Sequence, residues 1–171
     1  MATNRRILLS EIPTGKLTEE HFTQDEIELA SPGEDEVLVR TLILSQDAAN
    51  RAWMQGATYR SALSSGQVMS SGGIAEVVES NVDRFKVGQI VSGDLGWQEY
   101  AVIPGHQLTP VKDHDGPLSH SLSLLGVAGL TAYHGLINVP GIHAGEVLLV
   151  SAAGGSVGSI VGQIGRIKGA K

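Results

Sequence analysis

The chain has 171 residues, of which 42% are hydrophobic and 4% aromatic, and its formal net charge is -6 at pH 7. This composition supports an aliphatic core, and the 12 dispersed basic residues exclude a nucleic-acid-binding face. The sequence has no cysteine and no apolar run near the length of about 18 residues that a membrane span needs, which excludes disulfides, thiolate zinc sites, a cysteine nucleophile and a membrane-spanning helix.

The residues before Gly116 predict a β-rich front domain made of short strands. The clearest strand is Glu36–Leu44, in which apolar side chains follow an alternating pattern. Turns rich in proline and glycine separate the strands, and their repeat of roughly 8 to 12 residues indicates a small barrel. In chain order we expect strands at Arg5–Ser10, Glu36–Leu44, Val68–Met69, Ile74–Val78, Gln89–Val91, Glu99–Ile103 and Leu108–Val111, with a loosely alternating segment at His21–Leu29, a short helix within Ser45–Met54 and a bulge or bend at Gly72-Gly73.

Beyond Gly116 the sequence predicts helices and then a nucleotide-binding segment. Leu118–Leu125 and Gly129–Ile137 are expected to form two helical segments, which glycines separate. Glu146–Val150 is a short apolar run of the kind that forms a buried parallel strand. Glycines follow this run, and an amphipathic helix is expected behind them because apolar residues recur every three or four positions, at Val157, Ile160, Val161, Ile164 and Ile167.

Strand, glycine turn and helix in this order predict the first half of a dinucleotide-binding βαβ unit. The spacing is Ala153-x-Gly155-x-x-Gly158, with alanine where the usual fingerprint begins with glycine. A pyrophosphate binds to backbone N–H groups and to the positive end of a helix dipole, and residues without side chains let the backbone come close to it. Gly158, Gly162 and Gly165 share one line of the helix, which allows close packing on a sheet. The alternative is a tight strand-to-helix turn in another α/β protein.

The end of the chain bears on the cofactor. The residue that recognises the adenosine ribose is expected roughly 20 residues after the glycines, at the end of the second strand. The sequence stops at Lys171, where that strand would begin. We therefore expect a truncated cofactor domain, in which neither the choice between NADP and NAD nor the catalytic residues can be assigned.

Two other motifs have alternative interpretations. His114, in Asp113-His114-Asp115-Gly116, is the most ligand-like histidine, but the same residues form a good turn. No second histidine or cysteine at a ligand spacing supports it, so no metal site is expected. The run Gly154-Gly155-Ser156-Val157-Gly158 also matches the Gly-x-Ser-x-Gly elbow of α/β-hydrolases. A hydrolase is disfavoured because none of the 13 residues after Gly158 is Asp, Glu or His.

The whole chain resembles the medium-chain dehydrogenase/reductase superfamily, and within it the zinc-independent branch of prostaglandin reductases and alkenal double-bond reductases. The matching stretches follow one another in the family order. They are Asn4–Leu8, Glu36–Arg40, Leu44–Met54, Gly66–Ser80, Gly96–Val102, Gly129–Leu136 and the glycine turn. The resemblance implies a GroES-like, partly open barrel as the catalytic domain (1–125), followed by a connector and the first strand, loop and helix of a Rossmann domain that binds NADP(H) (126–171).

The same resemblance assigns roles to individual positions. Gly155, Ser156, Val157 and Gly158 match the loop that supports the pyrophosphate, and Thr131 and Val127 match positions that line the nicotinamide. The segment Asp47–Asn50 passes beside that ring, and Tyr59 lies in the substrate-side loop, so Asn50 and Tyr59 are the expected substrate-side residues. The chain departs from the family at Ala48 and Ala128, where proline is common, at Asn50, where methionine is usual, and at Ser70, where arginine is usual. These departures bear on substrate preference more than on fold.

The expected function is NADPH-dependent reduction of the carbon–carbon double bond of α,β-unsaturated ketones or aldehydes, a small-molecule reaction without metal. A quinone reductase of the same superfamily is the alternative enzyme. The other alternative is a non-catalytic fragment. A parallel sheet needs paired strands and covered faces, so with one strand and one helix Val147–Val150 and the apolar helix stripe would lie open, and we expect an exposed apolar surface with self-association or a disordered tail. The resemblance implies that complete relatives form homodimers. We expect a cytoplasmic protein, because the apolar run after Arg5-Arg6 is too short for a secretion signal.

Overall fold

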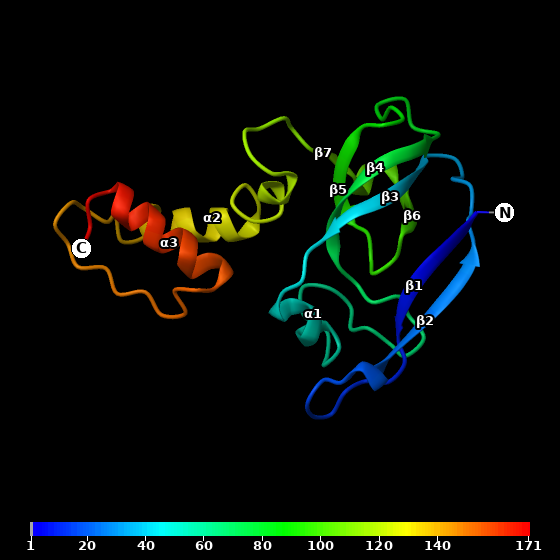
Figure 1. The fold of residues 1–171 in the computed structure, drawn as a ribbon, viewed down its shortest axis with the longest axis horizontal. Coiled ribbons are helices and arrows are strands. Elements are labelled where there is room, and N and C mark those ends of the chain that lie inside the picture. The colour runs from blue at the N-terminus through cyan, green and yellow to red at the C-terminus, as the bar shows by residue number, and fades with distance from the viewer. Residues whose placement is uncertain (1) are drawn as a thin grey trace. The chain divides into compact units, whose positions relative to one another are not determined.

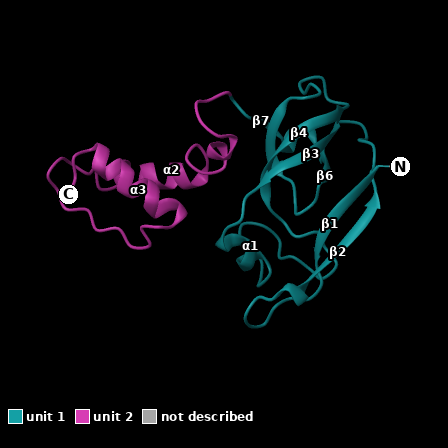
Figure 2. Cartoon of the chain, viewed as in Figure 1, with its two compact units in different colours: residues 1–112 teal, residues 113–171 magenta. Residues whose placement is uncertain are grey.

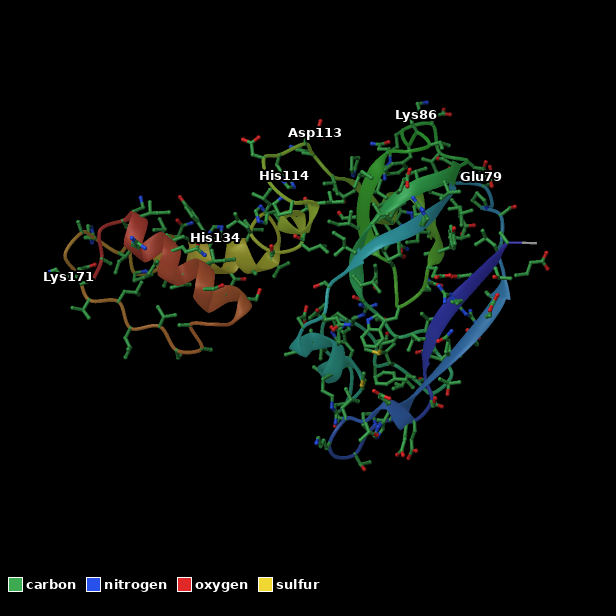
Figure 3. The ribbon with its side chains drawn as sticks, viewed as in Figure 1. Glu79, Lys86, Asp113, His114, His134 and Lys171 are labelled. Carbon is green, nitrogen blue, oxygen red and sulfur yellow. The ribbon has the colours of Figure 1, made fainter. Side chains whose placement is uncertain are left out.

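The computed structural model describes residues 2–171, which form two compact units (Figure 2). Unit 1 extends to Lys112, and unit 2 comprises Asp113–Lys171. Asp113 and His114 lie in the segment that opens unit 2 (Figure 3). The structural division comes earlier in the chain than the expected boundary between residues 125 and 126. The assignment of 1–125 to a catalytic domain and 126–171 to a cofactor domain stays a prediction.

A five-stranded antiparallel sheet forms the centre of unit 1, as the alternating sequence pattern predicts (Figure 1). Its strand order is β6-β3-β4-β5-β7. The strands are β3 (Glu36–Leu44), β4 (Gly72–Ser80), β5 (Ile90–Asp94), β6 (Tyr100–Pro104) and β7 (Thr109–Pro110). Val37, Val39, Ala75 and Val77 are buried in one core cluster with side chains from β5 and β6. The predicted strand Glu36–Leu44 is confirmed at both ends.

The irregularities of this sheet lie elsewhere than at the predicted glycine bulge. Gly73 pairs regularly with Leu44 on one side and with Gly93 on the other. A side chain at Gly73 would lie 2.6 Å from the carbonyl oxygen of Ile43, so close strand approach explains this glycine. The register between β3 and β4 shifts between Leu38 and Val39 and again between Thr41 and Ile43. The prediction of a bulge or bend at Gly72-Gly73 was therefore wrong.

A second, two-stranded sheet pairs β1 (Thr3–Leu9) with β2 (Phe22–Glu28). Isolated bridges connect β1 to Gln98 and to Val68. The predicted strand at Val68–Met69 is wrong as a regular strand, because only one bridge forms there. A second core cluster lies beside β1 and contains Leu9, Trp53, Met54, Leu63 and Met69. The short helix α1 (Ala48–Trp53) contributes Trp53 to it.

Two arginines of β1 form ion pairs that hold this strand in place. The Arg6 guanidinium donates two hydrogen bonds to Asp25 on β2, Nε to Oδ1 at 2.9 Å and Nη2 to Oδ2 at 2.5 Å. Arg5 donates from Nε to Oε1 of Glu99 at 3.0 Å. These hydrogen bonds lower the pKa of Asp25 and the pKa of Glu99 below their usual values, because they favour the charged carboxylates.

The Arg6–Asp25 pair predicts a specific loss of stability in acid. A carboxyl group whose pKa is lowered by folding stabilises the folded state above its unfolded pKa of about 4, and this stabilisation disappears as the pH falls through the folded pKa. We expect Asp25→Asn to flatten the decrease of the urea midpoint of unit 1 between about pH 5 and pH 2. Glu28→Gln, at the last residue of β2, is the control and should keep the wild-type acid slope. An unchanged slope in Asp25→Asn would contradict the assignment.

Unit 2 is built from helices rather than strands. Helix α2 (Val127–Tyr133) continues as a π-helical turn, His134–Asn138, and packs against α3 (Ser156–Ile167) (Figure 1). The predicted helix Leu118–Leu125 is limited to a 3-10 turn at Leu118–Ser121. The predicted helix at Val157–Ile167 is confirmed, and it begins one residue earlier.

The predicted strand Glu146–Val150 does not form a regular strand, but its first residues make the hydrogen bonds of a parallel pair. Lys171 N donates to Glu146 O at 2.8 Å, and Leu148 N donates to Lys171 O at 2.9 Å. The backbone N–H and carbonyl of Lys171 thus bond to the residues before and after Val147, which is the pattern of two neighbouring parallel strands. Lys171 lies at the end of the chain (Figure 3). Gly145 N also donates to Gly169 O, at 2.8 Å. The strand stays irregular because a ladder needs a partner along its length, and these three hydrogen bonds to residues 169–171 reach only Gly145, Glu146 and Leu148.

The apolar stripe of α3 is partly covered. Ile160 is buried, and Val161 and Ile164 are half-buried. The ends of the stripe are open, since Ile167 is 82% exposed. Gly165 is buried, and a side chain there would meet Leu148 at 2.3 Å, so the predicted close approach occurs at this glycine. Gly162 is exposed and a side chain there would meet nothing within 4 Å, so the same prediction is wrong for Gly162. The expectation that the whole stripe would lie open was wrong, because α2 packs against it.

Candidate functional site

The glycine turn before α3 has the geometry of an anion-binding loop. Gly155 is the residue before the first turn of α3, and no side chain among residues 2–171 caps the helix there. Gly155 N donates to Ala152 O at 2.8 Å, and Ala152 adopts a left-handed conformation with φ of 50°. The first N–H groups of a helix have no partner within the helix, so those of Ser156, Val157 and Gly158 are available to a ligand. Unit 2 therefore presents an uncapped helix N-terminus behind a tight turn.

One of the predicted loop residues needs to be glycine for steric reasons. A Cβ atom at Gly158 would lie 2.4 Å from the carbonyl oxygen of Ala152, whereas one at Gly155 would make only a tight contact, 3.1 Å, with the same oxygen. Ser156 is exposed, and Val157 is exposed on the same turn. A bound pyrophosphate would find backbone rather than side chains at this position, which is what the dinucleotide motif requires. The residues present therefore fit a dinucleotide phosphate.

Val127 and Thr131, the residues expected beside the nicotinamide, lie one turn apart on α2. The Thr131 hydroxyl donates to the carbonyl oxygen of Val127 at 2.7 Å. Val127 is 78% exposed and Thr131 is exposed as well, so this face of α2 is open. The structure thus brings these two residues together in the same unit as the glycine turn.

Asn50 is placed differently from a substrate-contacting residue. It is only 7% exposed, and both ends of its amide are in use. Its Oδ1 accepts from Asp47 N at 2.8 Å, and its Nδ2 donates to Ser70 O at 2.8 Å. Asp47 in turn caps α1 by accepting from Ala49 N at 2.6 Å. Asn50 therefore fixes Asp47 and the first turn of α1 against the segment that leads into β4.

Asn50→Ala should destabilise unit 1 without changing its charge. The substitution leaves the N–H of Asp47 and the carbonyl of Ser70 without their partner, which costs about 1 to 3 kcal/mol for partly buried groups. Urea unfolding followed by circular dichroism measures this loss. Ser70→Ala is the matched control, because the hydrogen bond uses the Ser70 carbonyl and not its hydroxyl. Equal stability of Asn50→Ala and the wild type would show that the amide bridge contributes nothing.

Tyr59, the second expected substrate-side residue, belongs to an aromatic and charged cluster. Its side chain is 83% exposed, and its ring meets Trp53 edge-on with centroids 6.1 Å apart. The guanidinium carbon of Arg60 lies 4.5 Å from the centre of the Trp53 ring, and Arg60 also forms an ion pair with Asp94 on β5. Arg60 therefore connects the segment that carries Tyr59 to helix α1 and to strand β5.

No sequence motif points to Arg60 or Asp94. Neither residue belongs to a motif, and they are 34 positions apart in the chain. The only sequence signal was the position of Arg60 directly after Tyr59. Pairing of these residues depends on the register of the five-stranded sheet, which local patterns do not encode.

The histidines show no metal-binding arrangement among residues 2–171. Within that range, no group of three or more His, Asp or Glu side chains is close enough to hold a metal ion. His114 instead bonds through Nε2 to Ser121 Oγ at 2.7 Å. Its ring stacks on His120 with centroids 6.3 Å apart.

The match to a family model decides the classification. A model described as the N-terminal domain of oxidoreductase matches residues 5–111, which is nearly all of unit 1. The chain belongs to this oxidoreductase family. With the relatives below, the match confirms membership of the medium-chain dehydrogenase/reductase superfamily, in its zinc-independent reductase branch.

Curated and solved relatives extend the similarity over both units. The NADPH-dependent curcumin reductase of Escherichia coli (strain K12) is 41% identical over 169 residues, which are 98% of this chain and 49% of the relative. Prostaglandin reductase 1 of Mus musculus is 41% identical over 157 residues, 90% of this chain and 46% of the relative. The crystal structure of CurA from Vibrio vulnificus in complex with NADPH is 36% identical, with a TM-score of 0.86 over 97% of this chain and 50% of that chain.

These family members confirm the α/β fold class, with a β-rich first unit. The chain spans about half the length of the curated relatives it matches. Among residues 2–171, no helix is long and apolar enough to cross a membrane.

Proposed function

We propose that the protein is an NADPH-dependent reductase of the carbon–carbon double bond of α,β-unsaturated ketones and aldehydes. The observation that carries the proposal is the uncapped N-terminus of α3, which follows a tight turn. The first turn of this helix has no room for a side chain at Gly158. The relatives support it further, since the E. coli relative is an NADPH-dependent curcumin reductase and the CurA structure contains NADPH. The chain spans about half the length of the curated relatives, so the activity is proposed for a protein of the relatives' length.

Residues of unit 2 hold the cofactor in this proposal. The backbone N–H groups of Ser156, Val157 and Gly158 bind the pyrophosphate, and the dipole of α3 adds favourable charge. Val127 and Thr131 present an open face of α2 to the nicotinamide. When bound, NADPH supplies the hydride for the β-carbon of the enone or enal. The remaining work of the protein is to orient the substrate and to exclude water around it.

Unit 1 supplies the substrate side. Asp47 and the first turn of α1 are held in place by the two hydrogen bonds of Asn50, so we assign Asn50 a positioning role rather than direct contact. Tyr59 is exposed and can reach a ligand directly. A residue that fixes the backbone of a binding segment restricts the orientations open to a bound substrate.

The test is reduction of an enone with NADPH as the hydride donor, measured on this chain and on the longer protein if the gene encodes one. The expected result is NADPH consumption with but-3-en-2-one and with trans-2-nonenal, and formation of the saturated product. Turnover of 1,4-benzoquinone alone would favour the alternative of a quinone reductase, to which a solved relative at 27% identity also belongs. No NADPH binding by any form of the protein would refute both.

We further propose that this chain self-associates through unit 2 and that the whole protein is cytoplasmic. Three aliphatic side chains of unit 2 are largely exposed: Val147 at 82%, Leu149 at 95% and Ile167 at 82%. Large aliphatic side chains are usually buried, and a group of exposed ones marks a surface that binds another protein chain. Size-exclusion chromatography with light scattering measures the mass. A monomer at micromolar concentration with the same side chains exposed would contradict self-association.

A further inference from the structure

The segment that carries Tyr59 leaves helix α1 and returns to it. Leu63 N donates at 2.9 Å to the carbonyl oxygen of Trp53, the last residue of α1, and this hydrogen bond closes a loop of residues 54–62. Leu63 is buried at the base of the loop, whereas Tyr59 is exposed. The base of the loop is therefore fixed to the core, and the placement of Tyr59 depends on what holds the rest of the loop.

Arg60 connects the outer part of this loop to other elements of unit 1. Among residues 2–171, the side chains of residues 56–62 make one hydrogen bond to another part of the chain, from Arg60 Nη2 to Asp94 Oδ2. Asp94 is the last residue of β5, so the bond reaches the five-stranded sheet. Arg60 also lines an open cavity of unit 1.

The guanidinium of Arg60 has a second contact, with the ring of Trp53. Its Cζ atom lies 4.5 Å from the centre of that ring, and Trp53 is buried, so the ring is a fixed surface. Planar stacking on an aromatic ring and a hydrogen bond to a carboxylate together leave a guanidinium few other orientations. Arg60 is therefore held from two sides.

Tyr59 packs on the same tryptophan as its neighbour. Its ring meets the Trp53 ring edge-on, with an angle of 87° between the planes. One edge contact restricts an exposed ring only weakly, because aromatic pairs add little beyond the area they bury. The direction of the Tyr59 side chain is therefore set mainly by the loop backbone, which Arg60 holds.

We propose that Arg60 is a positioning residue that acts through Tyr59. Its bridge from Trp53 to Asp94 keeps the loop in one conformation, and this conformation fixes the direction in which the Tyr59 side chain meets the substrate. The role in substrate binding rests on the proposed reductase function, whereas the placement of Tyr59 does not. A contact residue that is already oriented loses less freedom when the substrate binds, so the affinity is higher.

Fluorine NMR of the 171-residue chain labelled with 3-fluorotyrosine tests the placement directly. The sequence has three tyrosines, and Tyr59→Phe identifies the signal of Tyr59. The ring of Trp53 shifts this signal away from its position in the unfolded chain, and Arg60→Gln should return it most of the way. Asp94→Asn should move it in the same direction by less, because the contact with Trp53 remains. Arg40→Gln, an arginine that pairs with a glutamate on the sheet, is the matched control and should leave the signal unchanged.

Enzyme kinetics tests whether this placement serves the reaction. For the form of the protein that reduces enones and enals, Arg60→Gln should raise KM for trans-2-nonenal about fivefold and leave kcat unchanged, since a binding contact is weakened. Tyr59→Ala should raise KM about tenfold, because the contact itself is lost. When Tyr59→Ala is already present, Arg60→Gln should change KM by less than about twofold. General support of the fold would instead act equally with and without Tyr59.

Several results would overturn the proposal. An unmoved Tyr59 signal in a folded Arg60→Gln variant, the same shift in Arg40→Gln, or an equal rise of KM with and without Tyr59 would each do so. Thermal unfolding of each variant identifies a folding defect, and Asp94→Asn tests the same bridge from its other end. A shifted Tyr59 signal without any enone reduction would refute the reductase function and support the placement of Tyr59. Enone reduction with an unmoved signal would do the reverse.

Discussion

Gly158→Ala is expected to abolish most of the NADPH affinity of the protein. The new Cβ atom would lie 2.4 Å from the carbonyl oxygen of Ala152, a backbone atom that cannot rotate away. The turn of residues 152–155 must therefore move from the N-terminus of α3, and the pyrophosphate loses its backbone donors. We expect the Kd for NADPH to rise by about a hundredfold, equivalent to losing two charge-assisted hydrogen bonds at about 1.5 kcal/mol each. Fluorescence titration of NADPH measures it.

Gly162→Ala is the control on the same helix. A Cβ atom at Gly162 meets nothing within 4 Å, so the change adds a methyl group to an open surface. Alanine favours the helix by up to about 1 kcal/mol over glycine, and the variant should be as stable as the wild type or more so. NADPH affinity should stay within about twofold, since the substitution does not reach the turn. Equal loss of affinity in both variants would show that the helix as a whole, and not the turn, sets the affinity.

Leu9→Ala should cause the largest loss of stability in unit 1. Leu9 is completely buried and packs in the cluster of Trp53, Met54, Leu63 and Met69. Removing three heavy atoms leaves a cavity between β1 and α1, and such substitutions cost about 2 to 5 kcal/mol. Chemical denaturation of unit 1, monitored by the fluorescence of Trp53 and Trp97, measures the free energy of unfolding.

Leu42→Ala provides the matched leucine on the sheet surface. Leu42 is 41% exposed, so truncation removes little buried area and should change the free energy of unfolding by less than about 1 kcal/mol. The difference in the free energy of unfolding between the two variants measures the effect of burial, because the residue type is the same in both. A cost below about 1 kcal/mol for Leu9→Ala would mean that the cluster around Trp53 collapses into the space without strain.

The elements that the sequence predicted well are those with a strong local period. Glu36–Leu44 alternates over nine residues and forms β3 with those ends, and the stripe that begins at Val157 forms α3. The glycine turn was also predictable, because its spacing predicts positions that have no room for a side chain. Gly158 is such a position in the structure. The short strand at Val68–Met69 and the helix at Leu118–Leu125 were wrong, since a few apolar residues do not distinguish a bridge or a turn from a regular element.

The candidate site was predictable only in part, because only some of its residues belong to a local sequence pattern. Gly155, Gly158, Thr131 and Val127 belong to motifs in consecutive sequence, so their placement follows from local structure: Val127 and Thr131 lie on α2, Gly155 is the N-cap residue of α3, and Gly158 lies in its first turn. The role of Asn50 did not follow, because its partner Ser70 is 20 positions away.

The sequence by itself determined the family, the β-rich front of the chain and the glycine turn at the start of α3, because each of these depends on residues that are neighbours in the chain. Only the tertiary structure decided that Arg60 lies between Trp53 and Asp94 at the wall of a cavity. The physical reason is that strand register and core packing bring together side chains that are tens of residues apart, and neither periodicity nor motif spacing records that contact.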